Sequence, residues 1–310
     1  MPVSRREFLK GVAATATATA IAIASAVPLG CATTPTRPRG QRIRFGYAAI
    51  TWGGADLLAI EQISALGYPG IQLRNRVVAQ FGGNPAVLRE LLAQKKLTFV
   101  ALSSGNVSIE PSRQAATIAE HVGHAQFLRD AGGLYLQVLD EPPRGRGVTP
   151  DDCVRLGGLL SEIGQRSAAL GIPLVYHQHM NTISEKPDDA ERVLAASDPK
   201  YVKLLLDVAH WQQGGGDPVA AIRKHRDRIV LLHLKDVEPV PAIGTKPAGY
   251  RFVELGRGRV DLPAVFDALR EVKYEGWAVV ELDSVTDLGH SAADAAANNK
   301  TYLESRGFSL

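Results

Sequence analysis

The sequence contains little cysteine and shows none of the spacings that cysteine-based sites require. Its 310 residues include two cysteines, Cys31 and Cys153, and no CxxC pair. Two cysteines so far apart, with the first at the end of a leader segment, argue against a disulfide framework and against a cysteine-rich metal site. Cys153 lies in a stretch with helical spacing, where we interpret it as a buried structural thiol.

The chain also lacks an excess of charge of either sign. It has 35 Lys and Arg residues against 32 Asp and Glu residues, a formal net charge of +3. Residues 1–30 hold three basic residues and one acidic residue, so the remainder has 32 against 31, or +1. We therefore expect no nucleic-acid partner, because phosphate binding needs a concentration of basic side chains. The same balance disfavours a metal-dependent endonuclease.

Long apolar runs are scarce, and the most prominent one lies near the N-terminus. Val12–Val27 is diluted by threonine and is shorter than the roughly 20 residues that a membrane-spanning helix needs. It follows the charged segment Ser4–Lys10, an arrangement that predicts a cleavable export signal. The pair Arg5-Arg6 and its flanking residues resemble a twin-arginine signal. We predict such a signal over 1–30, export by the twin-arginine translocase and a periplasmic location.

Two processing sites compete at the end of this leader. Leu29-Gly30-Cys31 resembles the lipidation site of a bacterial lipoprotein, although Pro28 departs from that pattern. Ala24-Ser25-Ala26 is a small-x-small cleavage signal of the ordinary kind. The polar stretch 31–42, which contains proline and glycine, suits a tether. We favour a membrane anchor through lipidated Cys31, with cleavage after Ala26 as the alternative.

Beyond residue 42 the sequence repeats one pattern, a short apolar run followed by a segment with helical spacing. Continuous apolar runs are typical of parallel strands that are buried on both faces. Eight such units without a linker predict an α/β fold, a (β/α)₈ TIM barrel over 43–310. An open doubly wound sheet is the alternative, but no GxGxxG follows the first strand. The expected strands are 43–52, 70–73, 97–103, 134–139, 173–179, 202–207, 229–235 and 276–282.

Ionisable side chains stand at the ends of the last four expected strands. His177, Asp207, His233 and Glu281 come from successive strands, whose carboxyl ends meet at one mouth of a barrel. Imidazole and carboxylate ligands suit Mn²⁺, Mg²⁺ or Co²⁺, with Zn²⁺ as an alternative. Each residue alone is more often structural, and Asp207 also suits a helix N-cap. The joint pattern nevertheless predicts a divalent metal site.

The metal candidates have ionisable neighbours two or three residues further on. His179 and Lys235 each stand two residues after a candidate ligand, so they point to the same side of their strands. His210 follows Asp207 by three residues. Such groups beside a metal suit proton transfer or stabilisation of an oxyanion. We therefore predict His179, His210, Lys235 and Glu281 as catalytic residues.

Substrate contacts are harder to predict. Trp52 and Trp211 stand near strand ends and would stack on a sugar face, although core packing is an equal alternative. Asn181, close after His179, is the third substrate-binding candidate. Gly256-x-Gly258 lies on a long loop expected over 237–259 and is a weak indication of phosphate binding.

Four motifs together resemble the xylose isomerase-like TIM barrel superfamily, the sugar phosphate isomerase and epimerase group. They are Leu206-Asp207-x-x-His210, His233-Leu-Lys235-Asp236, Gly256-x-Gly258-x-Val260-Asp261 and Tyr274-x-Gly276-Trp277-x-x-x-Glu281-x-Asp283. The resemblance covers about 43–305. It implies a divalent metal held by an acid, Asp, His and Glu from strands five to eight, which correspond here to His177, Asp207, His233 and Glu281.

The sequence departs from this family at His177, where isomerases and epimerases usually have Glu. The segment 177–182 looks more like the inosose dehydratase and 3-dehydroshikimate dehydratase branches. There the residues that correspond to His179 and His210 are acid–base candidates. The missing glutamate disfavours epimerisation by two carboxylates.

The residues and the resemblance give three functional hypotheses. The first is a metal-dependent isomerase or epimerase that abstracts a proton alpha to a carbonyl of a sugar, keto-sugar or cyclitol. The second is a dehydratase or lyase on the same site, and the third is a non-catalytic periplasmic sugar-binding lipoprotein. The expected partner is a small carbohydrate, which export would make unphosphorylated, and a homo-oligomer remains open.

Overall fold

The computed structural model describes residues 43–310 except 243–244, 246 and 287. The predicted signal segment and tether, residues 1–42 with Cys31, lie outside the described residues. None of the helices in the described part of the chain combines the length and apolarity needed to traverse a bilayer.

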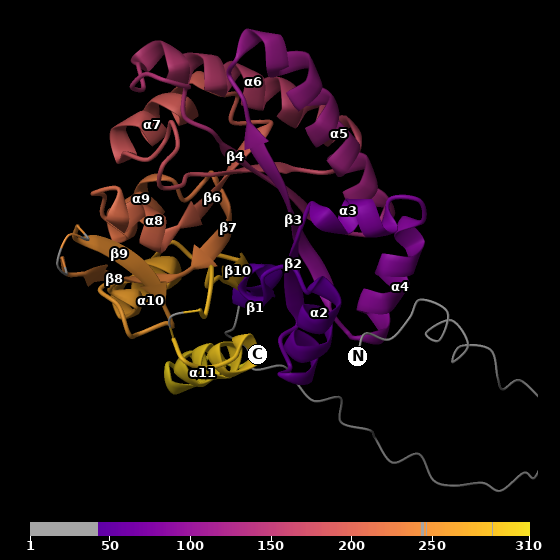
Figure 1. Ribbon diagram of the computed structural model, residues 1–310, viewed down its shortest axis with the longest axis vertical. Coiled ribbons are helices and arrows are strands. Elements are labelled where there is room, and N and C mark those ends of the chain that lie inside the picture. The colour runs from indigo at the N-terminus through magenta and orange to yellow at the C-terminus, as the bar shows by residue number, and fades with distance from the viewer. Residues whose placement is uncertain (1–42, 243–244, 246, 287) are drawn as a thin grey trace, which may run out of the picture. The chain divides into compact units, whose positions relative to one another are not determined.

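The predicted barrel is confirmed. Eight parallel strands close in the order β1-β10-β7-β6-β5-β4-β3-β2 (Figure 1). The carboxyl ends of all eight therefore open at one mouth. The strands are β1 (Ile43–Ala48), β2 (Gly70–Arg74), β3 (Thr98–Val107), β4 (Tyr135–Asp140), β5 (Leu174–His177), β6 (Val202–Asp207), β7 (Ile229–Leu234) and β10 (Gly276–Val280).

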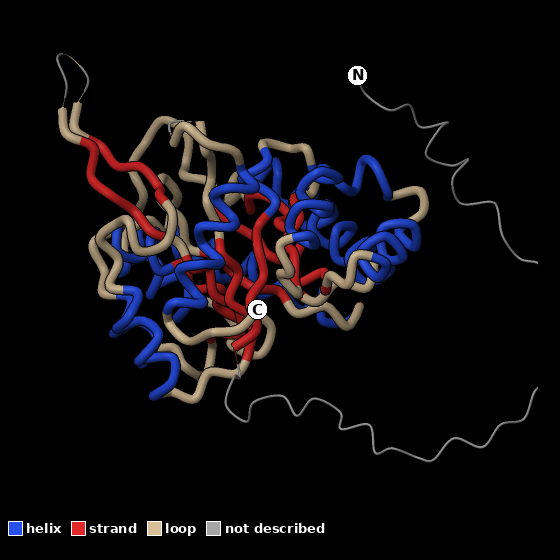
Figure 2. The backbone as a smooth tube through the Cα atoms, turned by 90° about the horizontal axis from the view of Figure 1, so that it is seen from below, coloured by secondary structure: helices blue, strands red, loops and turns tan. Residues whose placement is uncertain are grey.

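Helices surround the strands, as Figure 2 shows in blue around red. Thr149 and Ser291 begin the two longest helices of the second half with capping boxes, which satisfy free backbone N–H groups. The helices are α2 (Asp56–Ala65), α3 (Arg76–Phe81), α4 (Pro85–Gln94), α5 (Gln114–Asp130), α6 (Pro150–Ala169), α7 (Pro187–Ala196), α8 (Val208–Gln213), α9 (Pro218–Lys224), α10 (Leu262–Glu271) and α11 (Ala292–Ser305), with short 3₁₀ turns η1 (Ala49–Trp52) and η2 (Pro111–Arg113).

Apolar side chains fill the barrel below the mouth. Val175, Leu205, Leu231 and Trp277 belong to one fully buried cluster. Gly70 makes room for the indole, since a Cβ there would lie 2.4 Å from the Trp277 ring. Side chains alternate along a strand. The residue two positions after Val175, Leu205 or Leu231 therefore also points into the barrel, one level nearer the mouth. In β5, β6 and β7 those residues are the predicted metal ligands.

β3 is longer than expected, because a bulge extends it to Val107. Its register with β4 shifts between Ser103 and Asn106, and Gly105 adopts a φ of +110°. That backbone conformation is open to glycine and strained for other residues. The bulge displaces the end of β3 at the barrel mouth.

The loop expected over 237–259 contains an antiparallel hairpin, β8 (Asp236–Val240) and β9 (Gly249–Val253). It stands away from the barrel in Figure 2. Buried Asp236 accepts hydrogen bonds from the backbone N–H groups of Gly256 and Gly258, both at 2.9 Å, and from Val260 at 3.0 Å. These donors are occupied by a carboxylate, so the phosphate interpretation of the two glycines is wrong.

Candidate metal centre and active site

The four predicted metal ligands come together at the mouth of the barrel. β5 ends at His177 and β6 ends at Asp207. His233 is the next-to-last residue of β7, and Glu281 directly follows β10. All four are buried, and one ligand atom from each lies within 4.8 Å of the others. His233 Nδ1 is 3.5 Å from both Asp207 Oδ2 and Glu281 Oε1.

Three of these ligand atoms have no hydrogen-bond partner among the described residues. They are His177 Nδ1, Asp207 Oδ2 and His233 Nδ1, each fully enclosed. Buried polar atoms are rarely left without a partner, because the desolvation cost is then uncompensated. A divalent ion would satisfy all three, and imidazole with carboxylate is a donor set that such ions accept. The residues present therefore fit a metal.

Asp207 has two roles. Its Oδ1 accepts from the N–H groups of Ala209 and His210 at 2.9 Å each, which caps α8. Its Oδ2 faces the cluster. The N-cap alternative and the ligand prediction therefore describe different oxygens of the same carboxylate.

Gln72, on the opposite side of the barrel in β2, orients two of the ligands. His233 Nε2 donates to Gln72 Oε1 at 2.9 Å, so Nδ1 carries the lone pair that faces the cluster. The Gln72 amide nitrogen donates to Gln137 at 2.9 Å and to Glu281 Oε2 at 3.4 Å. The sequence interpretation missed Gln72 and Gln137, because a glutamine in an apolar strand gives no sign of chemistry.

The ionisation states also suit a cation. Burial, and then the neighbouring His233, hold the pKa of His177 well below its ordinary value, so the ring is neutral and can ligate. Burial alone would raise the pKa of Glu281, but His233 and Lys235 lower it to about 2. Glu281 is therefore a carboxylate at neutral pH.

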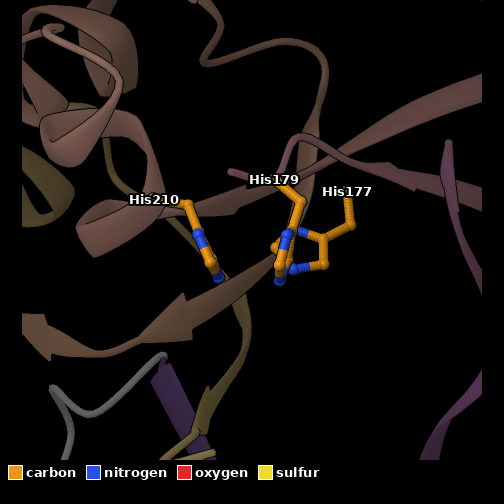
Figure 3. Close-up of side chains that lie close together, drawn as sticks. All are labelled: His177, His179 and His210. Atoms are coloured by element: carbon orange, nitrogen blue, oxygen red, sulfur yellow. The ribbon is translucent and has the colours of Figure 1, made fainter. Parts of the chain in front are cut away.

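His177 also belongs to a group of three histidines with His179 and His210 (Figure 3). The rings of His179 and His210 lie side by side, with centroids 3.7 Å apart. Lys235 Nζ lies 3.2 Å from His210 Nε2, so a metal at that nitrogen would face an ammonium group. The group with two carboxylates is therefore the better metal site, and His179 and His210 remain free for other chemistry.

His179 is placed to accept a proton. Its Nδ1 donates to the carbonyl of Met180 at 2.7 Å, which leaves the lone pair on Nε2. The side chain is half-buried and lines the cavity, whereas His210 is fully buried behind it. Burial, and then Lys235, hold the pKa of His210 well below its ordinary value.

Lys235 is fully buried, yet it is paired on two sides. Its Nζ donates to Asp283 Oδ1 at 2.6 Å and to Glu281 Oε1 at 3.1 Å. Phe252, from the hairpin, covers the ammonium with its ring centroid 4.0 Å away. Burial would lower the pKa of Lys235, but the two carboxylates raise it above its ordinary value, so the side chain is charged. Asp283 and Phe252 were not among the predicted site residues.

A cavity of about 630 Å³ opens beside this cluster. His177, His179, Glu281 and Asp283 line one end of it. The lining continues to residues on the other side of the mouth, namely Ile50, Arg74, Asn75, Ser103, Gly105, Asn106, Arg113, Glu120, Gln137, Leu139 and Glu141.

The predicted substrate-binding residues are placed differently. Trp52 is buried in the core, where its indole N–H donates to Gln62 at 2.6 Å, and Trp211 is 3% exposed. Neither belongs to the cavity lining, so core packing, the alternative interpretation, describes both rings. Asn181 is exposed, has a φ of +61° and donates its backbone N–H to Glu185 Oε2 at 2.8 Å.

The fold and the cluster define a class of protein: (β/α)₈ barrels with a histidine–carboxylate metal site at the mouth. The chain belongs to the xylose isomerase-like TIM barrel family, whose model matches residues 60–306. Together with the relatives described next, this makes it an enzyme of the isomerase, epimerase and dehydratase kind.

An inosose dehydratase from Lacticaseibacillus casei is 27% identical over 273 residues, which cover 78% of this chain and 90% of that protein. The IOLI protein, solved with a bound zinc atom, superimposes with a TM-score of 0.70 at 19% identity over 86% of this chain and all of its own. A probable 3-DHS dehydratase from Bacillus anthracis superimposes with a TM-score of 0.68 at 17% sequence identity. The match covers 85% of this chain and 99% of that protein. The predicted resemblance to the dehydratase branches is confirmed.

Proposed function

We propose that this protein is a divalent-metal-dependent dehydratase or lyase that acts on a keto-sugar or cyclitol. The observation that carries the proposal is the buried cluster of His177, Asp207, His233 and Glu281, with three ligand atoms unpartnered and a histidine base beside it. The inosose dehydratases among the relatives support elimination as the reaction.

The four cluster residues would hold the ion, and a bound divalent ion would polarise the substrate carbonyl as a Lewis acid. This would lower the pKa of the adjacent C–H. Glu281 and Asp207 supply the negative charge that keeps the ion in place, while Gln72 keeps His233 in the tautomer that ligates.

His179 is the base. Its Nε2 lone pair faces the cavity, and it takes the proton alpha to the carbonyl. The C–H electron pair becomes the new double bond as the β-oxygen leaves with the electrons of its C–O bond. The imidazolium returns its proton to that oxygen, so the net change is the loss of water or an alcohol.

Lys235 lies behind Glu281 and Asp283, outside the cavity lining, and from there its charge would stabilise the negative charge that develops on the substrate oxygen. Its raised pKa keeps it protonated, so its role is electrostatic. Asp283 and Glu281 hold the ammonium in place, and Phe252 separates it from solvent. His210 lies behind the site, between His179 and Lys235.

Epimerisation is the second candidate. It needs a proton returned to the opposite face of the same carbon, and hence a second proton-transfer group besides His179. The ionised Glu281 lines the cavity and would be the base on one face, with the proton returned on the other face by protonated His179. Without a returned proton the reaction continues to elimination.

We also propose that the enzyme acts outside the cytoplasm, on an unphosphorylated substrate. The support is the sequence of the leader, with Arg5-Arg6 and the apolar run that follows. Fractionation of expressing cells, with and without an Arg5→Lys/Arg6→Lys change, tests this. Protein that stays in the cytoplasm in both cases contradicts it.

The reaction is tested by incubating the metal-loaded protein in heavy water with inososes, keto-sugars and 3-keto-glycosides. Elimination predicts new ultraviolet absorbance from the conjugated product, and epimerisation predicts deuterium in a recovered isomer. His179→Gln is expected to abolish both, whereas His225→Gln, a change outside the cavity, leaves them intact. A protein that takes up metal and binds sugar but gives neither signal with any compound is a binding protein.

A further inference from the structure

We propose that the side of the mouth opposite the metal cluster is an outer subsite that takes the second sugar ring of a disaccharide-type glycoside. It is formed by the ends of β2, β3 and β4, and we define it by Arg74, Ser103, Asn106, Arg113 and Glu141. The proposal rests on the proposed function, because the first ring is the one that meets His179.

The size of the cavity is the first observation. At about 630 Å³ it lies in the middle of the range of roughly 300–1,000 Å³ typical of pockets for drug-sized ligands. One hexose or cyclitol ring between His179 and Glu281 fills only part of that volume. The remainder extends to Arg113 and Glu141, on the far side of the barrel mouth.

The chemistry of the outer lining favours a sugar over an aromatic group. Ser103, Asn106 and Arg74 offer hydroxyl, amide and guanidinium groups, and no Phe, Tyr or Trp occurs among the described residues that line the cavity. Arg113 forms an ion pair with Glu141, so this pair presents donors and acceptors without net charge. Arg74 is exposed and lines the cavity, so its guanidinium is accessible to hydroxyl oxygens.

The side-chain alternation aims Arg74 into the same space. It stands two residues beyond Gln72 in β2, just as Lys235 stands two residues beyond His233 in β7. Because residues two apart point to one side of a strand, Arg74 occupies the level above the metal cluster. Arg74, which ends β2, and Lys235, which directly follows β7, thus both stand above the metal cluster.

The bulge in β3 is held rigidly, as a binding surface requires. Ser104 Oγ lies 2.6 Å from His121 Nδ1 and 2.8 Å from His124 Nδ1, and His121 Nε2 lies 3.4 Å from the carbonyl of Asn106. One set of tautomers satisfies all three contacts: His124 donates to Ser104, Ser104 donates to His121, and His121 donates to Asn106. The Asn75 side chain also donates to the Ser104 carbonyl at 3.2 Å.

The test compares one-ring and two-ring compounds on the metal-loaded full-length protein. Binding of glucose, cellobiose, maltose and trehalose is measured by calorimetry, and kcat/KM is measured for their 3-keto derivatives. We expect at least one disaccharide to bind at least tenfold more tightly than glucose. The Arg74→Ala/Asn106→Ala variant should reduce this ratio, and the matching kcat/KM ratio, at least tenfold. Arg89→Ala, an exposed arginine on α4 outside the cavity, should leave both ratios unchanged.

The outcomes separate this proposal from the proposed function. Equal affinity for glucose and every disaccharide, or a double variant that weakens all sugars equally, overturns the outer subsite while turnover of one-ring keto-sugars stands. Conversely, tight disaccharide binding that depends on Arg74 and Asn106, without turnover of any 3-keto compound, supports the subsite and contradicts the reaction. The calorimetric ratio decides the subsite in either case.

Discussion

The two sides of the barrel mouth are built on different principles. On the β5, β6, β7 and β10 side, most of the functional groups are buried and ionisable. Apart from the ligand atoms, most of their buried polar atoms are hydrogen-bonded within the protein. On the β2–β4 side they are polar and partly exposed, as Asn106 and Arg74 are. Chemistry requires charges held in a low-dielectric site, whereas sugar recognition requires accessible donors and acceptors. The changes below test this division.

The largest effect is expected from removing a metal ligand. His233→Ala takes away one ligand and leaves the Gln72 side-chain oxygen without its donor. Metal content should fall far below one ion per chain, and turnover should fall by roughly 10³-fold or more, since a Lewis acid contributes several kcal/mol. Glu281→Ala should behave alike. Elemental analysis and kinetics check this, with His225→Ala as the matched control. Full metal content in the His233 variant would contradict the site.

The next effect concerns the buried ammonium. Lys235→Met preserves the length of the side chain and removes its charge. If Lys235 stabilises negative charge in the transition state, kcat should fall by roughly 10²–10³-fold while the metal stays bound. Lys224→Met, on the surface beside Glu191, is the control. A variant that loses its metal along with its activity would instead assign Lys235 to holding the carboxylates in place.

A smaller effect is expected from changing Gln72, which contacts two of the metal ligands and is not a ligand itself. Gln72→Leu removes the amide that orients His233 and contacts Glu281, so metal affinity should fall by roughly 10–100-fold. Gln72→Glu keeps an acceptor for His233 Nε2 and adds negative charge beside the cation, so the loss of affinity should be smaller. Calorimetric titration with Mn²⁺ or Zn²⁺ measures both, and Gln126→Leu on α5 is the control. Unchanged affinity in both variants would remove Gln72 from the account.

The smallest effect belongs to the β2–β4 side and concerns stability. Burial lowers the pKa of His121 to about 4. The unfolded chain, with a pKa near 6.5, therefore binds the proton first as the pH falls, and the stability that the neutral ring contributes is lost between about pH 6.5 and 4. Between pH 7 and 5.5 this amounts to about 1 kcal/mol.

Urea unfolding of the wild type and of His121→Gln at several pH values measures the His121 contribution. The variant should show a shallower decline toward acid, whatever its stability at pH 7. Parallel curves for the two proteins would show that His121 has no part in the acid sensitivity.

The fold could be predicted from the sequence because the signal is local and repeated. Each barrel strand is a short apolar run, and in β7 the alternation that buries Leu231 also aims His233 at the mouth. The metal ligands could be predicted for the same reason, since each stands at the end of such a run. Their approach to within 4.8 Å of one another follows from the closure of the barrel.

The rest depends on contacts between distant segments. Gln72 acquires its role from His233, 161 positions further along the chain. The burial of Trp52 and Trp211 depends on which helix each ring meets, and spacing alone does not distinguish a core ring from one that stacks on a sugar. The hairpin is short and rich in proline and glycine, which is also the composition of a loop, so the sequence did not predict it. The contact of Phe252 with Lys235 depends on that hairpin and could not be predicted either.

The position of one metal ion decides whether the cluster at the mouth is an active site. Anomalous diffraction from crystals of the protein grown with Mn²⁺ or Zn²⁺ would locate it directly. We predict a single strong peak about 2.0–2.3 Å from His177 Nδ1, Asp207 Oδ2, His233 Nδ1 and a Glu281 oxygen. A peak elsewhere, or no peak at saturating metal with the four side chains ordered, would contradict the central claim.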